Sequence, residues 1–234
     1  MSRFSNGLFC LLFVAASINA KPRSILCIGD SLTLGASKPS FVVGGYRGIL
    51  QSLLTEAGSP VEFVGSRTDN SEGMASPRHE GWPGYRIEQI EAAALPTLIK
   101  DRADIVLLLA GTNDVRQGFV LAEAPARLEV LITLIAKLQP QAAIFVGSLP
   151  LLLFDPKHEH QTEARQAFNR SIPDIITRCA TRGLHVELVD VRETLASADI
   201  CSDTVHPTFS GYSKLGRAWF TAITASSNLE LLSR

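Results

Sequence analysis

The sequence predicts one α/β domain in which a five-stranded parallel sheet lies between two helical layers, a three-layer α/β/α sandwich. Five apolar runs with strand character recur along the chain, with helical patterns between them. These runs are residues 24–28, 61–65, 104–110, 143–148 and 184–189. No repeat, low-complexity tract or linker divides the chain. Alternating strands and helices connect by right-handed crossovers, which make the sheet parallel.

The third run gives the clearest strand signal. Residues 105–109 read Ile-Val-Leu-Leu-Leu, with no alternation of polar and apolar side chains. Continuous apolar character is typical of a strand that is covered on both faces. We therefore expect helices to pack on both sides of this strand.

The clearest helix lies between the third and fourth runs. Its apolar residues recur at helical spacing and form one stripe, made of Leu128, Leu131, Ile132, Ile135 and Leu138. Gln139-Pro140 ends this helix. Residues 87–99 and 163–182 also have helical patterns, which Pro96 and Pro173 are expected to kink or divide. A last helix is predicted over residues 210–225.

Composition and charge narrow the class of protein. Of the 234 residues, 46% are hydrophobic and 19% are charged, and the formal net charge is −1. These values are typical of a folded globular chain and exclude a disordered one. The chain has no basic block, so we expect no nucleic-acid partner and no attraction to an anionic membrane surface.

The first twenty residues have the pattern of a secretory signal peptide. Arg3 is followed by nine uninterrupted apolar residues, 8–16, and then by small residues up to Ala20. A membrane span needs about 20 apolar residues, so this run is too short for an integral membrane anchor. We expect residues 1–20 to be removed, leaving a domain of residues 21–234 that is secreted or periplasmic.

Removal of the signal peptide would leave Cys27, Cys179 and Cys201. Cys27 lies in an apolar run and is interpreted as a core residue. Cys179 and Cys201 could form a disulfide in an oxidising compartment, which the sequence alone leaves open. His158 and His160 could bind a metal ion together, but their surroundings favour a polar loop. We expect no metal site and no cofactor.

Candidate catalytic residues lie in the segments that follow the predicted strands. In parallel sheets, ligands bind beyond the carboxyl ends of the strands. Gly29-Asp30-Ser31-Leu32 follows the first run and Gly111-Thr112-Asn113-Asp114 follows the third. Near the C-terminus, Asp203 and His206 are three residues apart, so one turn of chain can bring the carboxylate to the imidazole. A serine nucleophile needs such a base and such a carboxylate, although each piece alone is common in turns and helix caps.

At these residues the chain resembles the SGNH, or GDSL, hydrolase family. Four blocks carry the resemblance in the family's order, namely residues 29–32, 81–84, 111–114 and 203–206. The resemblance implies the family's flavodoxin-like fold and a catalytic triad of Ser31, His206 and Asp203. It also implies an oxyanion hole made of the Ser31 and Gly84 backbone N–H groups and the Asn113 amide. The implied activity is hydrolysis of carboxylic esters.

Two further stretches, residues 44–47 and 79–86, resemble those of secreted carbohydrate esterases, especially acetylxylan esterases. This resemblance implies removal of short acyl groups such as acetyl from a polysaccharide or a smaller ester. Within it, Trp82 and Tyr85 could form a platform for a sugar ring or simply pack the loop. His79 could touch substrate or hold local structure.

Two alternatives remain open at this point. Residues 149–154 are apolar enough to line an acyl pocket, so a lysophospholipase or thioesterase of the same family is possible. The fold could also serve as a non-catalytic carbohydrate-binding module, because fold does not fix function. The presence of Ser31, Asp203 and His206 together argues against the second alternative.

Overall fold

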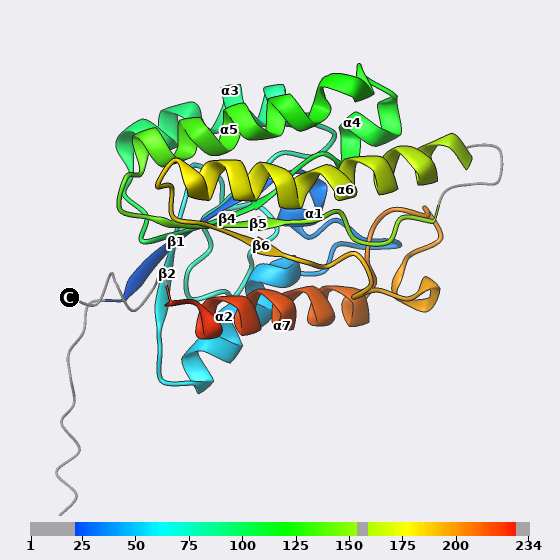
Figure 1. Cartoon of the computed structure of the whole chain (residues 1–234). Coiled ribbons are helices and arrows are strands. Elements are labelled where there is room, and N and C mark those ends of the chain that lie inside the picture. The colour runs from blue at the N-terminus through cyan, green and yellow to red at the C-terminus, as the bar shows by residue number, and fades with distance from the viewer. Residues whose placement is uncertain (1–21, 154–158, 228–234) are drawn as a thin grey trace, which may run out of the picture.

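In the computed structural model, which describes residues 22–153 and 159–227, a parallel sheet lies between two layers of helices (Figure 1). The strands are β1 (Arg23–Gly29), β2 (Val61–Val64), β3 (Glu80–Gly81), β4 (Ile105–Leu109), β5 (Ala143–Gly147) and β6 (Val186–Val189). All five predicted strands are confirmed. The two-residue strand β3 was not predicted, because so short a segment carries no hydrophobic period.

The strand order is β2-β1-β4-β5-β6, with β3 paired to β1, and every pairing is parallel. Without β3 this is the 2-1-3-4-5 order of the flavodoxin-like fold. β1 and β4 are neighbours, and Gly29 pairs with Leu109 at their carboxyl ends. The segments that leave these two strands therefore start side by side, although they are 80 residues apart in the chain.

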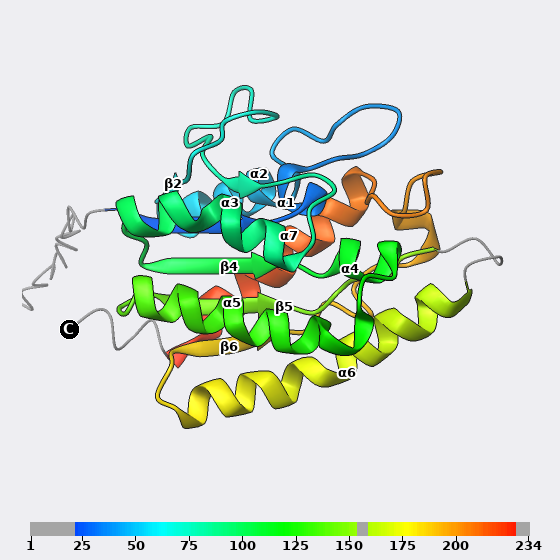
Figure 2. The same cartoon turned by 90° about the horizontal axis from the view of Figure 1, so that it is seen from above.

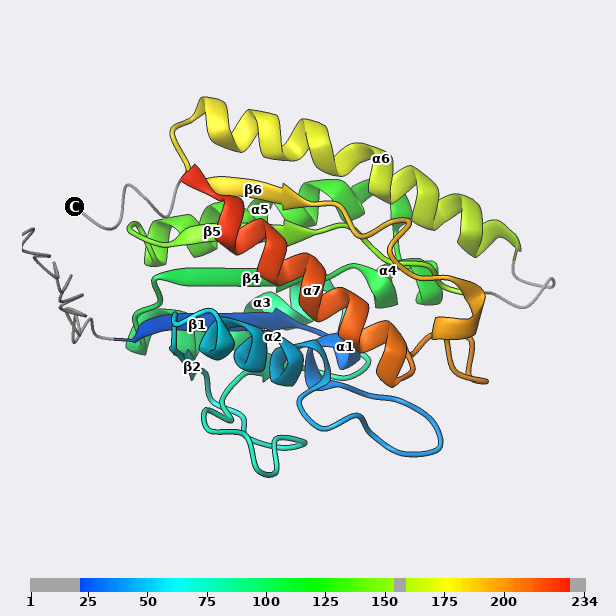
Figure 3. The ribbon, with the colours of Figure 1, turned by 90° about the horizontal axis from the view of Figure 1, so that it is seen from below.

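The helices divide between the two faces of the sheet (Figures 1 and 3). One face is covered by α2 (Gly45–Glu56) and α7 (Phe209–Ala225), and the other by α3 (Ile87–Lys100), α5 (Ala124–Leu138) and α6 (Glu159–Thr181). Two short helices, α1 (Ser31–Leu34) and α4 (Thr112–Gln117), follow β1 and β4. All five residues of β4 are buried, as the sequence predicts.

The expectation that Pro96 and Pro173 would divide their helices is wrong. Both α3 and α6 continue through the proline as one helix. A proline inside a helix costs about 3 kcal/mol. Burial of apolar side chains next to it, such as Leu98 in α3 and Ile175 in α6, offsets that cost.

The suggested disulfide between Cys179 and Cys201 is not formed. Both cysteines are buried and free, and so is Cys27. Cys179 belongs to the core under α3, α5 and α6. The Cys201 Sγ lies 3.2 Å from the Ser37 Oγ, and the preceding residue Ile200 belongs to the core under α2 and α7. The two cysteines therefore belong to different packing regions. Burial raises the pKa of the Cys27 thiol to about 12, which agrees with its predicted place in the core.

Residues 1–20 and His158 lie outside the described residues, so the predicted signal peptide stays a prediction. Across residues 22–153 and 159–227, no helix combines the length and the apolar character that crossing a bilayer requires.

Candidate active site

Ser31 begins α1, directly after the end of β1. Gly29 is needed at that end because an added Cβ would lie 2.3 Å from the Leu109 carbonyl oxygen. Asp30 caps the helix, its Oδ1 accepting a hydrogen bond from the Leu32 N–H at 2.9 Å. The residue Ser31 is 7% exposed, so its side chain lies at the floor of the site with little freedom to move.

Asp203 and His206 are brought together by a tight turn. The Asp203 Oδ1 accepts hydrogen bonds from the backbone N–H groups of Val205 (3.1 Å) and His206 (2.9 Å). Thr204 has a φ of +68°, an unusual conformation for a residue with a Cβ. The Cys201 N–H donates to the His206 carbonyl at 2.8 Å, which closes the turn. The turn fixes the carboxylate below the imidazole, as the three-residue spacing predicts.

Ser31, His206 and Asp203 form a continuous chain of side-chain hydrogen bonds. The His206 Nδ1 lies 2.7 Å from the Asp203 Oδ2, and the His206 Nε2 lies 2.9 Å from the Ser31 Oγ. A carboxylate only accepts, so Nδ1 carries the proton and Nε2 is left to accept the serine proton. Burial acts to raise the pKa of Asp203, but hydrogen bonds from the His206 N–H and ring and from Val205 outweigh it and lower that pKa.

The loop that contains Gly84 reaches Ser31 through the short strand β3. Glu80 and Gly81 pair with the last two residues of β1, and the Trp82 N–H donates to the Gly29 carbonyl at 2.9 Å. Gly84 itself has a φ of +79°. An added Cβ there would meet no protein atom within 4 Å, so the backbone conformation and not close packing requires glycine.

Asn113 lies in the first turn of α4, after β4. Its Nδ2 donates to the Tyr85 carbonyl at 2.9 Å, and its side chain is almost fully buried. An amide nitrogen carries two protons, so one remains to face a ligand. The bond also ties Asn113 to the loop that contains Gly84, and the Gln117 Nε2 adds a bond to the Gly84 carbonyl at 3.1 Å. These two bonds hold the loop that contains Gly84 next to Asn113 at the start of α4.

Asp114 supports the loop that contains Gly84. This residue was not singled out from the sequence. Its Oδ2 accepts from the Ile87 N–H at the start of α3 (3.0 Å), and its Oδ1 pairs with Arg127 (2.8 Å). Burial raises the pKa of Asp114, and the bonds from Arg127 and Ile87 oppose that rise. Asp114 thereby holds α4 and α3 together at the ends of the loop.

Trp82 and Tyr85 stack on each other in the loop that contains Gly84. Their rings stack with centroids 5.6 Å apart, and the Arg67 guanidinium lies 4.4 Å from the centre of the Trp82 ring. The Trp82 Nε1 donates to the buried Glu80 carboxylate at 3.0 Å. Glu80 also accepts from the Ser66 N–H and from the Thr97 hydroxyl. These contacts favour the packing interpretation for Trp82, while Tyr85 remains exposed at the surface.

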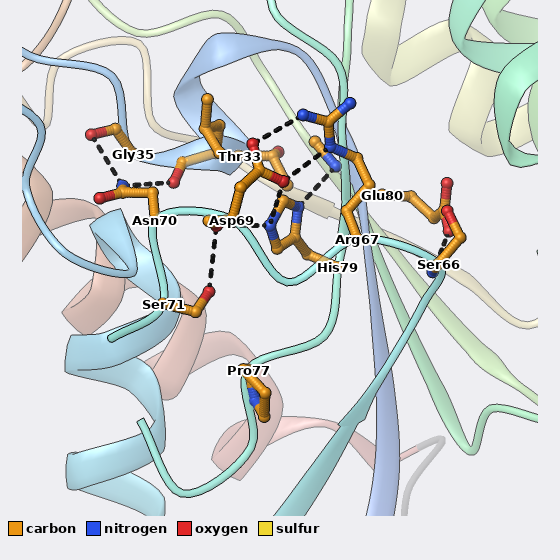
Figure 4. A network of polar contacts seen from close by, with 12 residues as sticks. Thr33, Gly35, Ser66, Arg67, Asp69, Asn70, Ser71, Pro77, His79 and Glu80 are labelled. Atoms are coloured by element: carbon orange, nitrogen blue, oxygen red, sulfur yellow. Dashed lines mark hydrogen bonds and ion pairs between the residues drawn. The ribbon is translucent and has the colours of Figure 1, made fainter. Parts of the chain in front are cut away.

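His79 holds local structure below this loop (Figure 4). It is fully buried, and its Nδ1 accepts from the Gly81 N–H at 3.0 Å. Its Nε2, 2.9 Å from the Asp69 carbonyl, must then be the donor, so the ring is neutral. Burial, together with the charge of Arg47, lowers the pKa of His79 to about 4. The alternative in which His79 touches substrate is not supported.

Arg47, in α2, anchors the other end of α1. Its guanidinium is fully buried and donates to the carbonyls of Thr33 (2.9 Å) and Leu34 (3.3 Å) and to the Ser71 hydroxyl (3.2 Å). A cation at the C-terminus of a helix satisfies carbonyl groups that have no helical partner. Arg47 therefore fixes the short helix that begins with Ser31.

Asp30, the residue before Ser31, has a pKa well above its ordinary value. It is fully buried, and burial raises its pKa to about 6, against the opposing bond from the Leu32 N–H. Its Oδ2 and the nearby Thr112 hydroxyl meet no protein partner with good hydrogen-bond geometry. No group of three or more metal-ligating side chains occurs in the described part of the chain.

Comparison with known families gives a match over most of the chain. The model of the "GDSL-like Lipase/Acylhydrolase family" matches residues 27–214. The chain is also 27% identical over 222 residues to a multidomain esterase from Ruminococcus flavefaciens. That match covers 85% of this chain but 28% of the relative, so the chain spans little more than a quarter of the relative's length.

Solved structures show the same fold. A family 3 carbohydrate esterase from Clostridium thermocellum is 30% identical, with a TM-score of 0.75 over 87% of this chain and 96% of that one. An acetylxylan esterase from Geobacillus stearothermophilus is 20% identical, with a TM-score of 0.65 over 87% of this chain and 95% of that one. The second likeness supports the fold alone.

Proposed function

The chain belongs to the GDSL-like lipase/acylhydrolase family, and from this premise we propose that it is a secreted serine esterase that removes short acyl groups, chiefly acetyl, from carbohydrate. The observation that carries the proposal is the hydrogen-bonded series of Ser31, His206 and Asp203 at 2.9 and 2.7 Å. The likeness to a family 3 carbohydrate esterase supports the carbohydrate substrate. The pattern of residues 1–20 supports secretion.

The reaction starts with attack of the Ser31 Oγ on the ester carbonyl carbon. His206 accepts the hydroxyl proton on Nε2, and Asp203 holds the ring and stabilises its positive charge. The carbonyl oxygen becomes an oxyanion, which accepts hydrogen bonds from the Ser31 and Gly84 N–H groups and from the free Asn113 proton. His206 then gives its proton to the sugar oxygen as the C–O bond breaks, which leaves an acyl group on Ser31.

Water completes the cycle. His206 takes a proton from the water that attacks the acyl carbon, and the same oxyanion donors stabilise the second tetrahedral intermediate. His206 returns this proton to the Ser31 Oγ as the carboxylic acid leaves. Every proton transfer uses one imidazole, so no metal ion or organic cofactor is required by the chemistry.

Covalent labelling with a fluorophosphonate tests the nucleophile. We expect label on Ser31 and none on Ser31→Ala, which should also lose about 10⁴-fold or more of kcat on p-nitrophenyl acetate. Ser52→Ala is the control, because Ser52 is an exposed residue of α2 that bonds only its own helix. Wild-type activity in Ser31→Ala would overturn the mechanism, as would absence of label on the active wild-type protein.

A panel of esters tests the substrate class. We expect kcat/KM to be highest on acetylated oligosaccharides, and to fall as the acyl chain of p-nitrophenyl esters grows from acetyl to octanoyl. Preference for octanoyl esters or lysophospholipid would contradict the carbohydrate assignment while leaving the serine mechanism intact.

A further inference from the structure

A cavity of about 480 Å³ lies between the loop that joins α1 to α2 and the start of α7. Six of its lining residues come from positions 37–43, and the other two are Thr208 and Phe209. Figures 2 and 3 both show this loop, in blue, next to the N-terminal end of α7, in orange. The volume lies within the range of about 300–1,000 Å³ that is usual for small-molecule sites.

Both walls of the cavity continue the segments that carry the candidate catalytic residues. Ser37 lies six residues after Ser31, and Thr208 lies two residues after His206. The Ser37 hydroxyl donates to the Pro207 carbonyl at 2.9 Å and so joins the two walls directly. A ligand that fills the cavity therefore lies next to the segment that holds His206.

The loop is held in one arrangement relative to α1. The Asn70 Nδ2 donates to the carbonyls of Leu34 and Val42, both at 2.8 Å. The Gly44 N–H donates to the Asn70 carbonyl at 2.7 Å, so Asn70 bonds both ends of the loop. Figure 4 shows Asn70 bonded beside Gly35, where α1 ends. Because its base is fixed, the wall is preorganised for binding.

Large apolar side chains gather at this cavity. Phe41 is 55% exposed, Phe209 is 65% exposed and Val43 is 48% exposed. Single exposed apolar residues are ordinary, whereas three that line one cavity make it a candidate binding surface. The same cavity is also lined by Lys38, an exposed cation, and by Ser40 and Thr208, which carry hydroxyl groups. The lining thus combines aromatic faces with scattered hydrogen-bonding groups.

We propose that this cavity binds a sugar residue of the carbohydrate ester, a neighbour of the residue that carries the acyl group. The inference rests on the esterase function proposed above. A pyranose ring has faces made of C–H groups and a rim of hydroxyl groups. The C–H faces pack against the negative faces of Phe41 and Phe209, and the hydroxyl groups meet Lys38, Ser40 and Thr208. An acyl chain could pack on the phenylalanine rings but would make no hydrogen bond with the Ser40 or Thr208 hydroxyl groups.

The test compares two esters in the same variants. For Phe41→Leu, Phe209→Leu and the double variant, kcat/KM is measured on acetylated xylo-oligosaccharide and on p-nitrophenyl acetate, which has no sugar. Leucine keeps an apolar side chain and removes only the aromatic face. We expect the ratio of the two kcat/KM values to fall about threefold for each single variant and about tenfold for the double variant, mainly through KM on the oligosaccharide.

Two control variants show whether the effect depends on the aromatic rings at the cavity. Phe41→Tyr keeps an aromatic face and should keep the wild-type ratio, and Ile99→Ala removes an equally exposed side chain from α3 and should also keep it. An unchanged ratio in the double variant would overturn the sugar site. Selective loss on long-chain p-nitrophenyl esters would overturn it too, because the occupant would then be an acyl chain. A wild-type protein that cleaves neither acetate ester would instead contradict the proposed function itself.

Discussion

On one side of the candidate active site, Ser31, His206 and Asp203 are joined through their side chains at 2.9 and 2.7 Å. On the other side, Gly84 and Asn113 are placed by hydrogen bonds in which at least one partner is a main-chain group. Trp82 bonds the end of β1 through its N–H, and the Tyr85 carbonyl receives the Asn113 amide. We call these the proton-transfer side and the oxyanion side.

The difference determines how each side should respond to substitution. On the proton-transfer side each atom has one role that no neighbour duplicates, so loss of one side chain stops the transfer. In the proposed oxyanion hole, the Gly84 N–H and the Asn113 amide share one charge with the Ser31 N–H, so loss of one donor should leave two. We therefore expect large effects on the first side and graded effects on the second.

Asp203→Ala should give the largest effect of the substitutions considered below. Without the carboxylate, the His206 ring loses its fixed tautomer and its orientation, and kcat should fall about 10⁴-fold. Steady-state kinetics on p-nitrophenyl acetate measures the loss. Asp190→Ala is the matched control, because Asp190 is also an ion-paired aspartate after a strand, with a pKa lowered to about 2 chiefly by Arg192. Equal kcat losses in both variants would mean that the effect is only structural.

Asn113→Ala should be folded and should lose about 10²–10³-fold in kcat, because one oxyanion donor is removed. Asn113→Asp keeps the shape but has no proton to donate and carries a negative charge, so its loss should be at least as large. Circular dichroism checks the fold, and single-turnover kinetics checks that acylation is the step that slows. A loss as large as that of Asp203→Ala would remove the proposed contrast between the two sides.

The candidate catalytic residues and the residues that support them are not equally predictable from the sequence. All five long strands and the residues Ser31, Asn113, Asp203 and His206 are predictable, because continuous apolar runs and reactive side chains each leave a local pattern. The residues that support the site are not predictable in this way. Arg47 bonds Thr33, Asn70 bonds Leu34 and Glu80 bonds Thr97, and no local pattern encodes pairs that are so far apart in the chain.

Some elements were missed for a different reason. Helix α2 begins with Gly45 and contains Gly48, both poor helix formers, which hides its buried stripe of Tyr46, Leu50 and Leu54. The prolines in α3 and α6 have the opposite effect, since local propensity predicts a break that tertiary packing overrides. Prediction from local helix propensity fails in these three helices because burial of their apolar side chains stabilises the helix.

Gly84→Ala should give a smaller effect than Asn113→Ala. The added methyl group has space, but a left-handed conformation costs an alanine about 1–2 kcal/mol, and the loop can relieve this strain only by moving the Gly84 N–H. We expect kcat to fall about tenfold. Gly118→Ala is a matched control, because Gly118 has a φ of +62° and equally open space at the end of α4. Both variants should lose similar stability, and only Gly84→Ala should lose kcat.

The last prediction concerns stability against pH, which should vary little in the wild-type protein because two buried groups, Asp30 and His79, contribute in opposite directions. Burial raises the pKa of Asp30 to about 6, above its ordinary value of 3.8, so the folded state holds that proton more tightly. The free energy of unfolding should then fall as the pH rises from about 4 to 6, by at most about 3 kcal/mol. His79 has its pKa lowered from 6.5 to about 4, so its contribution falls as the pH drops through the same range.

In the wild-type protein these two contributions oppose each other between about pH 4 and pH 6, so stability should vary little from this source. Asp30→Asn keeps the acceptor for the Leu32 N–H and removes the titrating carboxyl. Compared with the wild-type protein, its free energy of unfolding should therefore change more positively with pH over this range, because the Asp30 contribution is removed and the His79 contribution stays. His79→Gln should shift the slope in the opposite direction, because the Asp30 contribution stays. Urea unfolding at several pH values measures both slopes, and comparing slopes removes the constant cost of each substitution. If both variants shifted the slope in the same direction relative to the wild-type protein, the opposite pH dependences assigned to Asp30 and His79 would be wrong.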